Sequence, residues 1–111
     1  MTTDAIVALC SCPDEPTAER IARELVSSRL AACVQRLGGV RSVYRWEGLL
    51  RDDAEVLLLI KTTNSAYQAL EMRLKALHPY DVPEIIAFPV VAGSAEYLSW
   101  VMAESTTASH E

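Results

Sequence analysis

Hydrophobic residues recur along the chain with two different periods, and the alternation between these periods predicts the order of the elements. Short apolar runs rich in strand-forming residues, such as residues 5–12 and 83–91, are typical of β-strands. Apolar residues that recur every three or four positions, as in residues 13–31 and 65–78, are typical of amphipathic helices. The predicted order is strand, helix, strand, strand, helix, strand and short helix, over residues 5–12, 13–31, 32–48, 49–62, 65–78, 83–91 and 94–104.

The two longer helices carry recognisable signals at their ends. Asp14 and Ser65 are residue types that cap the N-terminus of a helix. Pro79 ends the second helix and favours an extended backbone at His78, the residue before it. The apolar stripe expected on the first helix consists of Ala18, Ile21, Ala22, Leu25 and Val26.

This order of elements is the βαββαβ arrangement of the α+β ferredoxin-like folds, in which two helices pack on one face of a four-stranded antiparallel sheet. The two central strands form a long hairpin with a tight turn near Glu47-Gly48, and Gly38-Gly39 predicts a bulge in its first strand. The first and last strands are too short to pair with the whole hairpin. Because proteins rarely leave such edges open, we expect the hairpin to pair with strands of neighbouring subunits.

Length and charge restrict the classes of function. With 111 residues, half of them hydrophobic, we expect a single domain over residues 1–104 and a flexible C-terminal tail over residues 105–111. The net charge of −5 argues against a nucleic-acid partner, and no basic run indicates a membrane surface. The N-terminus lacks the pattern of a signal peptide and no apolar run could span a bilayer, so we expect a cytoplasmic protein.

The candidate metal ligands do not follow the spacing of a known zinc motif. They are Cys10, Cys12, Cys33, His78 and His110. An odd number of cysteines argues against a disulfide framework, and we expect all three to be reduced. Cys10 and Cys12 share one face of the first strand, where they could hold a soft ion such as Cu(I) or could equally be small buried core residues.

A second set of polar and aromatic residues falls at or near the ends of the predicted strands. Its members are Trp46, Glu47, Glu55, Lys61, Tyr80, Asp81 and Glu84. Converging polar groups around aromatic rings can line a binding cleft, but aromatic residues with rim charges are also typical of a subunit interface. No nucleophile motif, phosphate loop or dinucleotide fingerprint is present, so we expect no enzymatic activity and no organic cofactor.

Several separate motifs resemble the CutA family, the divalent-cation tolerance proteins. The resemblance runs from Ile6 to about Val101 and includes "LCSCPDEPTAERIARELV", "LAACV", "YRWEG", "EVLLLIKTT", "LHPYDVPEII" and "YLSWV". It implies a ferredoxin-like protomer in a homotrimer related in fold to PII-type signalling trimers. It also implies copper binding, metal tolerance and a cytoplasmic location.

The resemblance further implies specific copper ligands. The family's ligands have been placed on a cysteine of the first strand and on two adjacent histidines before "PY", which Cys10 and His78 match. Leu77 stands at the position of the first histidine, and strand alternation suggests Cys12 as a substitute ligand. The motifs that resemble the family also place Trp46, Glu47, Lys61, Tyr80 and Glu84 in a cleft between subunits.

Three functional hypotheses follow. The first is a homotrimer that binds copper or other divalent cations through Cys10 and His78 and contributes to metal tolerance. The alternative is a PII-like sensor that binds a small anionic metabolite between subunits, with Lys61 as the contact to the anion. The third, an enzyme with Glu47 or Glu84 as general base, has no supporting motif.

Overall fold

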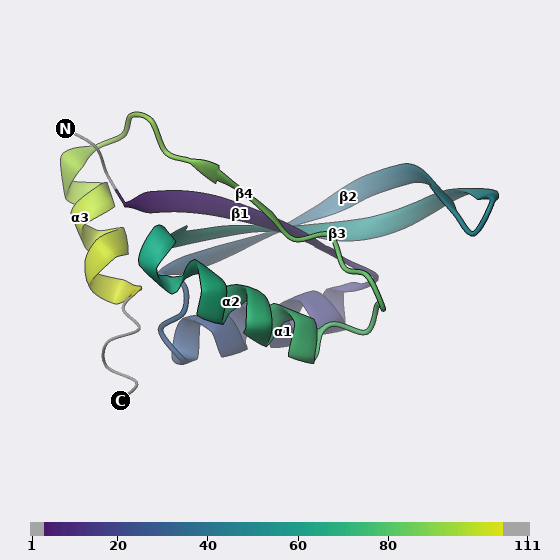
Figure 1. Cartoon of the computed structure of the whole chain (residues 1–111), viewed down its shortest axis with the longest axis horizontal. Coiled ribbons are helices and arrows are strands. Elements are labelled where there is room, and N and C mark those ends of the chain that lie inside the picture. The colour runs from purple at the N-terminus through teal and green to yellow at the C-terminus, as the bar shows by residue number, and fades with distance from the viewer. Residues whose placement is uncertain (1–3, 106–111) are drawn as a thin grey trace.

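The four strands form one antiparallel sheet, and the two longer helices cover one of its faces (Figure 1). The computed structural model describes residues 4–105. The strand order β2-β3-β1-β4 is that of the ferredoxin-like fold, as the sequence predicts, and α3 is added after β4. The elements are β1 Ala5–Cys12, α1 Glu15–Ser27, β2 Cys33–Trp46, β3 Leu49–Thr63, α2 Asn64–Leu77, β4 Ile86–Pro89 and α3 Ala95–Glu104.

The core lies between the helices and one face of the sheet. Alternate residues of β1, including Cys10 and Cys12, and alternate residues of β3, including Leu58 and Ile60, point toward the helices and are fully buried. Each fully buried leucine or isoleucine side chain contributes about 1.5–3 kcal/mol to folding. This burial fixes the register of β1, because a shift of one residue would bring the thiols to the opposite face.

The other face of the sheet, here called the open face, has apolar side chains that no element of residues 4–105 covers. Ile86 and Phe88 of β4 are 45% and 51% exposed. Their partners across the ladder, Leu9 and Val7 of β1, are only partly buried. An apolar sheet face of this kind is typical of a surface that packs against another sheet.

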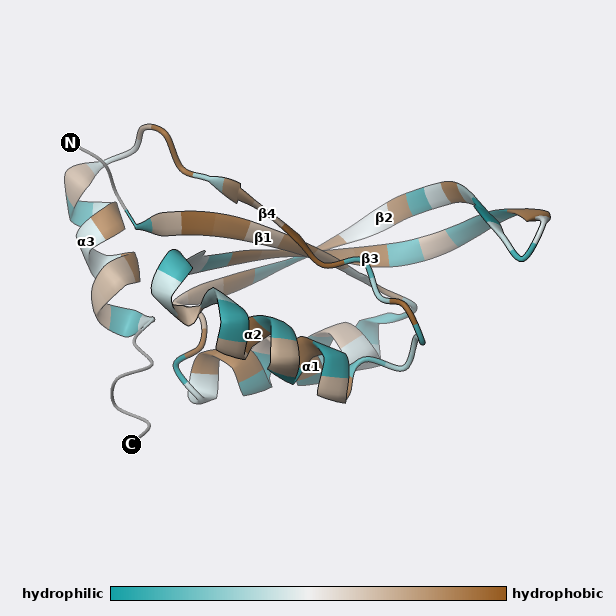
Figure 2. Cartoon of the chain, viewed as in Figure 1, coloured by the Kyte–Doolittle hydropathy of each residue, from teal (hydrophilic) through white to brown (hydrophobic). Residues whose placement is uncertain are grey.

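The β2–β3 hairpin extends well beyond the rest of the sheet, and in Figure 1 it projects away from the helices. β1 pairs with β3 only from Thr63 to Val56, so the remainder of β3 pairs with β2 alone. This part of the hairpin carries both hydrophobic and hydrophilic residues (Figure 2). The register shifts between Leu37 and Val40, as the two glycines predict. Glu47 and Gly48 form the turn with φ values of 51° and 79°.

Three expectations about the elements are wrong. Thr63, and not Ser65, caps α2, because the Thr63 hydroxyl accepts from the Ala66 N–H at 3.1 Å while the Ser65 hydroxyl donates to Asp4. Val26 is 41% exposed and lies outside the buried stripe of α1. The last strand is limited to Ile86–Pro89, because only these four residues pair with β1.

Replacing Thr63 by Ala should lower the free energy of unfolding by about 1–2 kcal/mol, because it removes the helix cap. The Thr63 hydroxyl also donates to the Ser105 carbonyl oxygen at 3.3 Å. Ser65→Ala is the matched control and should cost clearly less. Urea unfolding at equal protein concentration measures both, and equal losses would contradict the assignment of the cap.

Candidate functional site

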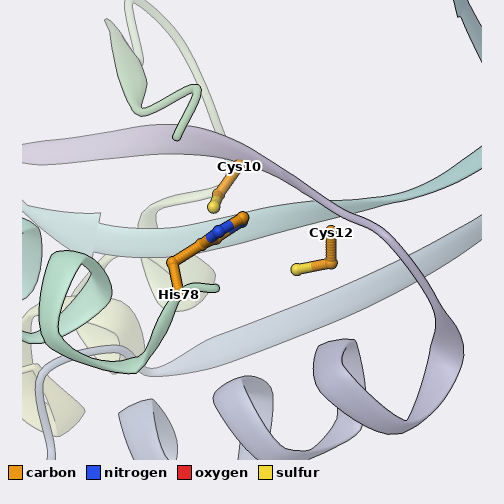
Figure 3. Close-up of side chains that lie close together, drawn as sticks. All are labelled: Cys10, Cys12 and His78. Atoms are coloured by element: carbon orange, nitrogen blue, oxygen red, sulfur yellow. The ribbon is translucent and has the colours of Figure 1, made fainter. Parts of the chain in front are cut away.

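Two thiols and one imidazole form a buried group, here called the thiol–imidazole cluster. Cys10 and Cys12 come from β1, and His78 directly follows α2 (Figure 3). One ligand atom from each of the three side chains lies within 4.8 Å of the other two. Both cysteines are fully buried, and His78 is 7% exposed. The structure therefore brings together Cys10 and His78, the two predicted ligands, with Cys12, the suggested substitute.

Local backbone geometry places each member of the cluster. Cys10 and Cys12 are two positions apart on a strand, so both side chains point toward the helices. The His78 N–H closes α2 on the Leu74 carbonyl oxygen at 2.9 Å, and the His78 backbone is extended, with φ −82° and ψ 139°. Pro79 accounts for this conformation, as the sequence predicts. The change of direction turns the imidazole back toward β1.

Both ring nitrogens of His78 have hydrogen-bond partners. Nε2 lies 2.7 Å from the Ser11 carbonyl oxygen, and Nδ1 lies 3.2 Å from the Tyr80 backbone nitrogen. A carbonyl oxygen can only accept and a backbone N–H can only donate, so Nε2 carries the proton and Nδ1 presents a lone pair. The ring also packs against the Tyr80 ring, with a distance of 4.7 Å between centroids.

The two thiols affect each other electrostatically. The hydrogen bond to Cys12, together with burial, raises the pKa of the Cys10 thiol, while the same hydrogen bond lowers the pKa of Cys12. The Cys10 thiol can also donate to the Ser11 carbonyl oxygen, which lies 4.0 Å from Sγ. Because a thiolate is the form that binds metal, both thiols must lose their protons if they act as ligands.

The cluster has the composition and size of a soft-metal site. Two sulfurs and an imidazole nitrogen are donors that Cu(I) and Zn²⁺ prefer. Three donors about 2.3 Å from one ion lie roughly 4 Å apart, so the observed cluster needs only a small contraction. Leu77 packs against the hydrophobic core. The thiol–imidazole cluster is the only group of three or more possible metal ligands in residues 4–105, and Cys33 does not belong to it. His110 lies outside the described residues.

A second candidate site is a cavity of about 880 Å³ beside the projecting hairpin, here called the hairpin cavity. Of the predicted cleft residues, Trp46, Tyr80 and Glu84 line it. Glu47 lies in the hairpin turn and is not among the lining residues. Lys61 lies within the paired part of β3 and donates to Gln35 at 2.8 Å. The structure thus brings three of the five predicted residues together.

Hydroxyl groups hold the carboxylates of the hairpin cavity in place. Ser42 and Tyr80 donate to the two oxygens of Glu55 at 2.6 Å and 2.9 Å. Ser11 donates to Glu84 at 3.0 Å. Burial and the hydrogen bond to Glu55 raise the pKa of Tyr80, so its hydroxyl stays protonated as a donor.

Sequence reasoning missed Ser42, Tyr44 and Asp53 as residues of the hairpin cavity. Ser42, Tyr44 and Trp46 alternate along β2 and therefore share one face. Asp53 pairs with Ser42 across the hairpin and shares that face. The spacing of these residues was visible in the sequence. The bulge between Leu37 and Val40, however, determines which face of the hairpin their side chains occupy.

Comparisons with known proteins agree on one family. Residues 6–104 match the family model described as CutA1 divalent ion tolerance protein. A Pectobacterium atrosepticum protein named divalent-cation tolerance protein CutA is 50% identical over 100 residues, which cover 90% of this chain and 91% of that protein.

Solved structures show the same fold. The divalent cation tolerance protein of Thermus thermophilus superimposes with a TM-score of 0.90 at 48% identity, covering 92% of this chain and 99% of that one. A protein of Archaeoglobus fulgidus named as the periplasmic divalent cation tolerance protein CutA gives a TM-score of 0.88 at 30% identity. It covers 92% of this chain and 99% of the other. In residues 4–105, no helix is long and apolar enough to cross a membrane.

Removing the Tyr80 hydroxyl should destabilise the fold by about 1 kcal/mol, because a hydrogen bond to the buried carboxylate of Glu55 is lost. The matched control is Tyr44→Phe, whose hydroxyl donates to the carboxylate of Asp53 at the surface. That change should cost less than half as much. Equal losses in the free energy of unfolding for Tyr80→Phe and Tyr44→Phe, measured by chemical unfolding, would show that the Tyr80–Glu55 hydrogen bond stabilises the fold no more than the surface bond does.

Proposed function

The chain belongs to the CutA1 divalent ion tolerance protein family, and on that premise we propose that it binds copper and contributes to metal tolerance. Cys10, Cys12 and His78 are the proposed ligands. The observation that carries this proposal is the approach of the three donor atoms within 4.8 Å of one another. Thiolate sulfur and imidazole nitrogen favour Cu(I) over hard cations such as Mg²⁺, and divalent ions such as Zn²⁺ are weaker candidates.

Cys12 takes the place of the donor that Leu77 does not supply. With only Cys10 and His78 the site would have two ligands, which makes it weaker and less selective than a site with three. The Cys12 thiol, which lies on the same strand face as Cys10, completes a set of three donors with His78. All three side chains act as metal ligands in this proposal, which leaves none of them as a nucleophile or general base. The role we propose is therefore metal binding and not catalysis.

The cytoplasm is the compartment we propose, because two buried free thiols persist best where the redox buffer keeps them reduced. The Archaeoglobus relative is named as periplasmic, so cell fractionation is the direct check. Recovery of this chain in a periplasmic extract would overturn the assignment.

We also propose that the protein is a homotrimer, in which the open face packs against neighbouring copies and the free edge of the hairpin pairs with their strands. Two features support this. Ile86 and Phe88 are exposed on the open face, and the distal half of β3 has no partner strand on one side. Both are features that proteins usually cover by association.

Cu(I) titration against a competing chelator tests the proposed ligands. We expect one ion per chain, with affinity reduced at least tenfold in Cys10→Ser, Cys12→Ser and His78→Ala. Cys33→Ser is the matched control, because this thiol lies outside the cluster. Binding that persists unchanged in all three ligand variants would rule out the cluster, and unchanged binding in Cys12→Ser alone would remove Cys12 from the ligand set.

Light scattering on reduced protein should give a mass about three times the chain mass of 12.2 kDa. Phe88→Glu should shift that mass toward the monomer, because it places a charge on the open face. The control is Met72→Glu, an exposed position on α2 that should leave the mass unchanged. A monomer mass for the unmodified protein at micromolar concentration would contradict the trimer.

A further inference from the structure

The charge of the hairpin cavity points to a ligand class that neither the family nor the proposed metal site accounts for. Four carboxylates line the cavity, those of Asp53, Glu55, Asp81 and Glu84, against a single cation, Arg51. Arg51 is already paired with Asp53 at 3.5 Å. The cavity therefore carries a net negative charge, and Lys61, the expected contact for an anionic metabolite, is not part of it.

Glu55 distinguishes the hairpin cavity from an ordinary acidic surface, because its carboxylate is buried. Only 8% of the Glu55 residue surface is exposed to solvent. Both of its oxygens accept hydrogen bonds from neutral hydroxyl groups, and no cationic side chain of residues 4–105 forms an ion pair with it. A buried carboxylate without a countercharge is costly, and a cation bound in the cavity would supply that charge.

Glu84 is the second carboxylate without a countercharge. It is exposed, accepts a hydrogen bond from Ser11 and takes part in no ion pair among residues 4–105. Glu55 and Glu84 contribute to the same cavity from different parts of the chain, the hairpin and the segment before β4. A ligand with two positive groups could therefore contact both.

Aromatic rings complete the lining. Tyr44, Trp46 and Tyr80 contribute to the cavity, and each is between 36% and 42% exposed. Aromatic faces attract ammonium groups and also pack against the methylene groups that connect them. A bare metal ion would use the carboxylates alone, and no group of acidic residues in residues 4–105 brings three oxygens close enough to hold one.

We propose that the hairpin cavity binds a small organic cation, an aliphatic amine with one or two ammonium groups. The buried carboxylate of Glu55 neutralises one ammonium group, Glu84 faces the second, and the aromatic rings contact the carbon chain. The volume of about 880 Å³ is within the range of small-molecule sites and accommodates such a ligand with water. This site is separate from the thiol–imidazole cluster, so it can exist whether or not the protein binds copper.

Calorimetric titration of metal-free, reduced protein with three probes of equal chain length tests the charge requirement. The probes are 1,4-diaminobutane, 1,4-butanediol and succinate, which carry two positive charges, no charge and two negative charges. We expect saturable heat of binding for the diamine alone, with a thermal shift that grows with its concentration. Equal responses to diamine and diol, or a response to succinate alone, would overturn the proposal.

Variants of the lining residues test the location. Glu55→Gln removes the charge and keeps one acceptor oxygen, so the amide can accept from Ser42 or from Tyr80 but not from both. It should weaken diamine binding at least tenfold. Trp46→Leu should weaken it about 2- to 30-fold through loss of the aromatic face. Glu19→Gln, on the solvent side of α1, is the matched control and should have no effect.

Two further results would contradict the proposal. Diamine binding that is as tight in Glu55→Gln as in the unmodified protein would place the ligand elsewhere. A change in oligomer mass caused by Glu55→Gln, with no diamine binding in either protein, would mean that a basic side chain of a second copy fills the cavity. Cys10→Ser should retain diamine binding, which separates this site from the proposed copper site.

Discussion

The hydrogen bond from His78 Nε2–H to the Ser11 carbonyl oxygen connects the two candidate sites of this protein. At 2.7 Å it attaches the end of α2 to β1 and sets the imidazole beside the two thiols. It also fixes the tautomer, so that Nδ1 accepts from the Tyr80 N–H. Tyr80 in turn reaches Glu55 with its hydroxyl. The chain of contacts from β1 through His78 to the hairpin cavity begins at this bond.

The same bond places a constraint on metal binding. Both nitrogens of the imidazole are already occupied, so a metal ion that binds His78 must replace one of the two hydrogen bonds. Loss of a buried partner costs about 1–3 kcal/mol, which the metal–ligand bonds have to exceed. If Nδ1 is the ligand, the Tyr80 N–H is released and the segment that lines the hairpin cavity loses an anchor. If Nε2 is the ligand, the Ser11 carbonyl oxygen loses its partner instead.

Sequence reasoning predicted the order of the elements and the fold, because the periods of hydrophobic residues are local signals. Cys10 and Cys12 could be placed on one face by strand alternation, and Pro79 predicted the extended backbone of His78. The approach of β1 and His78 is a tertiary contact, and only the resemblance to the CutA family suggested it in advance. The family assignment is confirmed by the match over residues 6–104.

The cavity was predicted only in part, for a physical reason. Lys61 and Trp46 both lie on the hairpin strands, but Lys61 belongs to the part that pairs with β1 and Trp46 to the part that projects. Their separation depends on which residues of β3 pair with β1, and this register is not given by periodicity.

Copper-edge X-ray absorption on protein loaded with one Cu(I) per chain tests the central claim most directly. The account predicts two sulfur neighbours and one nitrogen neighbour, with sulfur lost in the Cys10→Ser, Cys12→Ser double variant. Coordination by nitrogen and oxygen alone would contradict it.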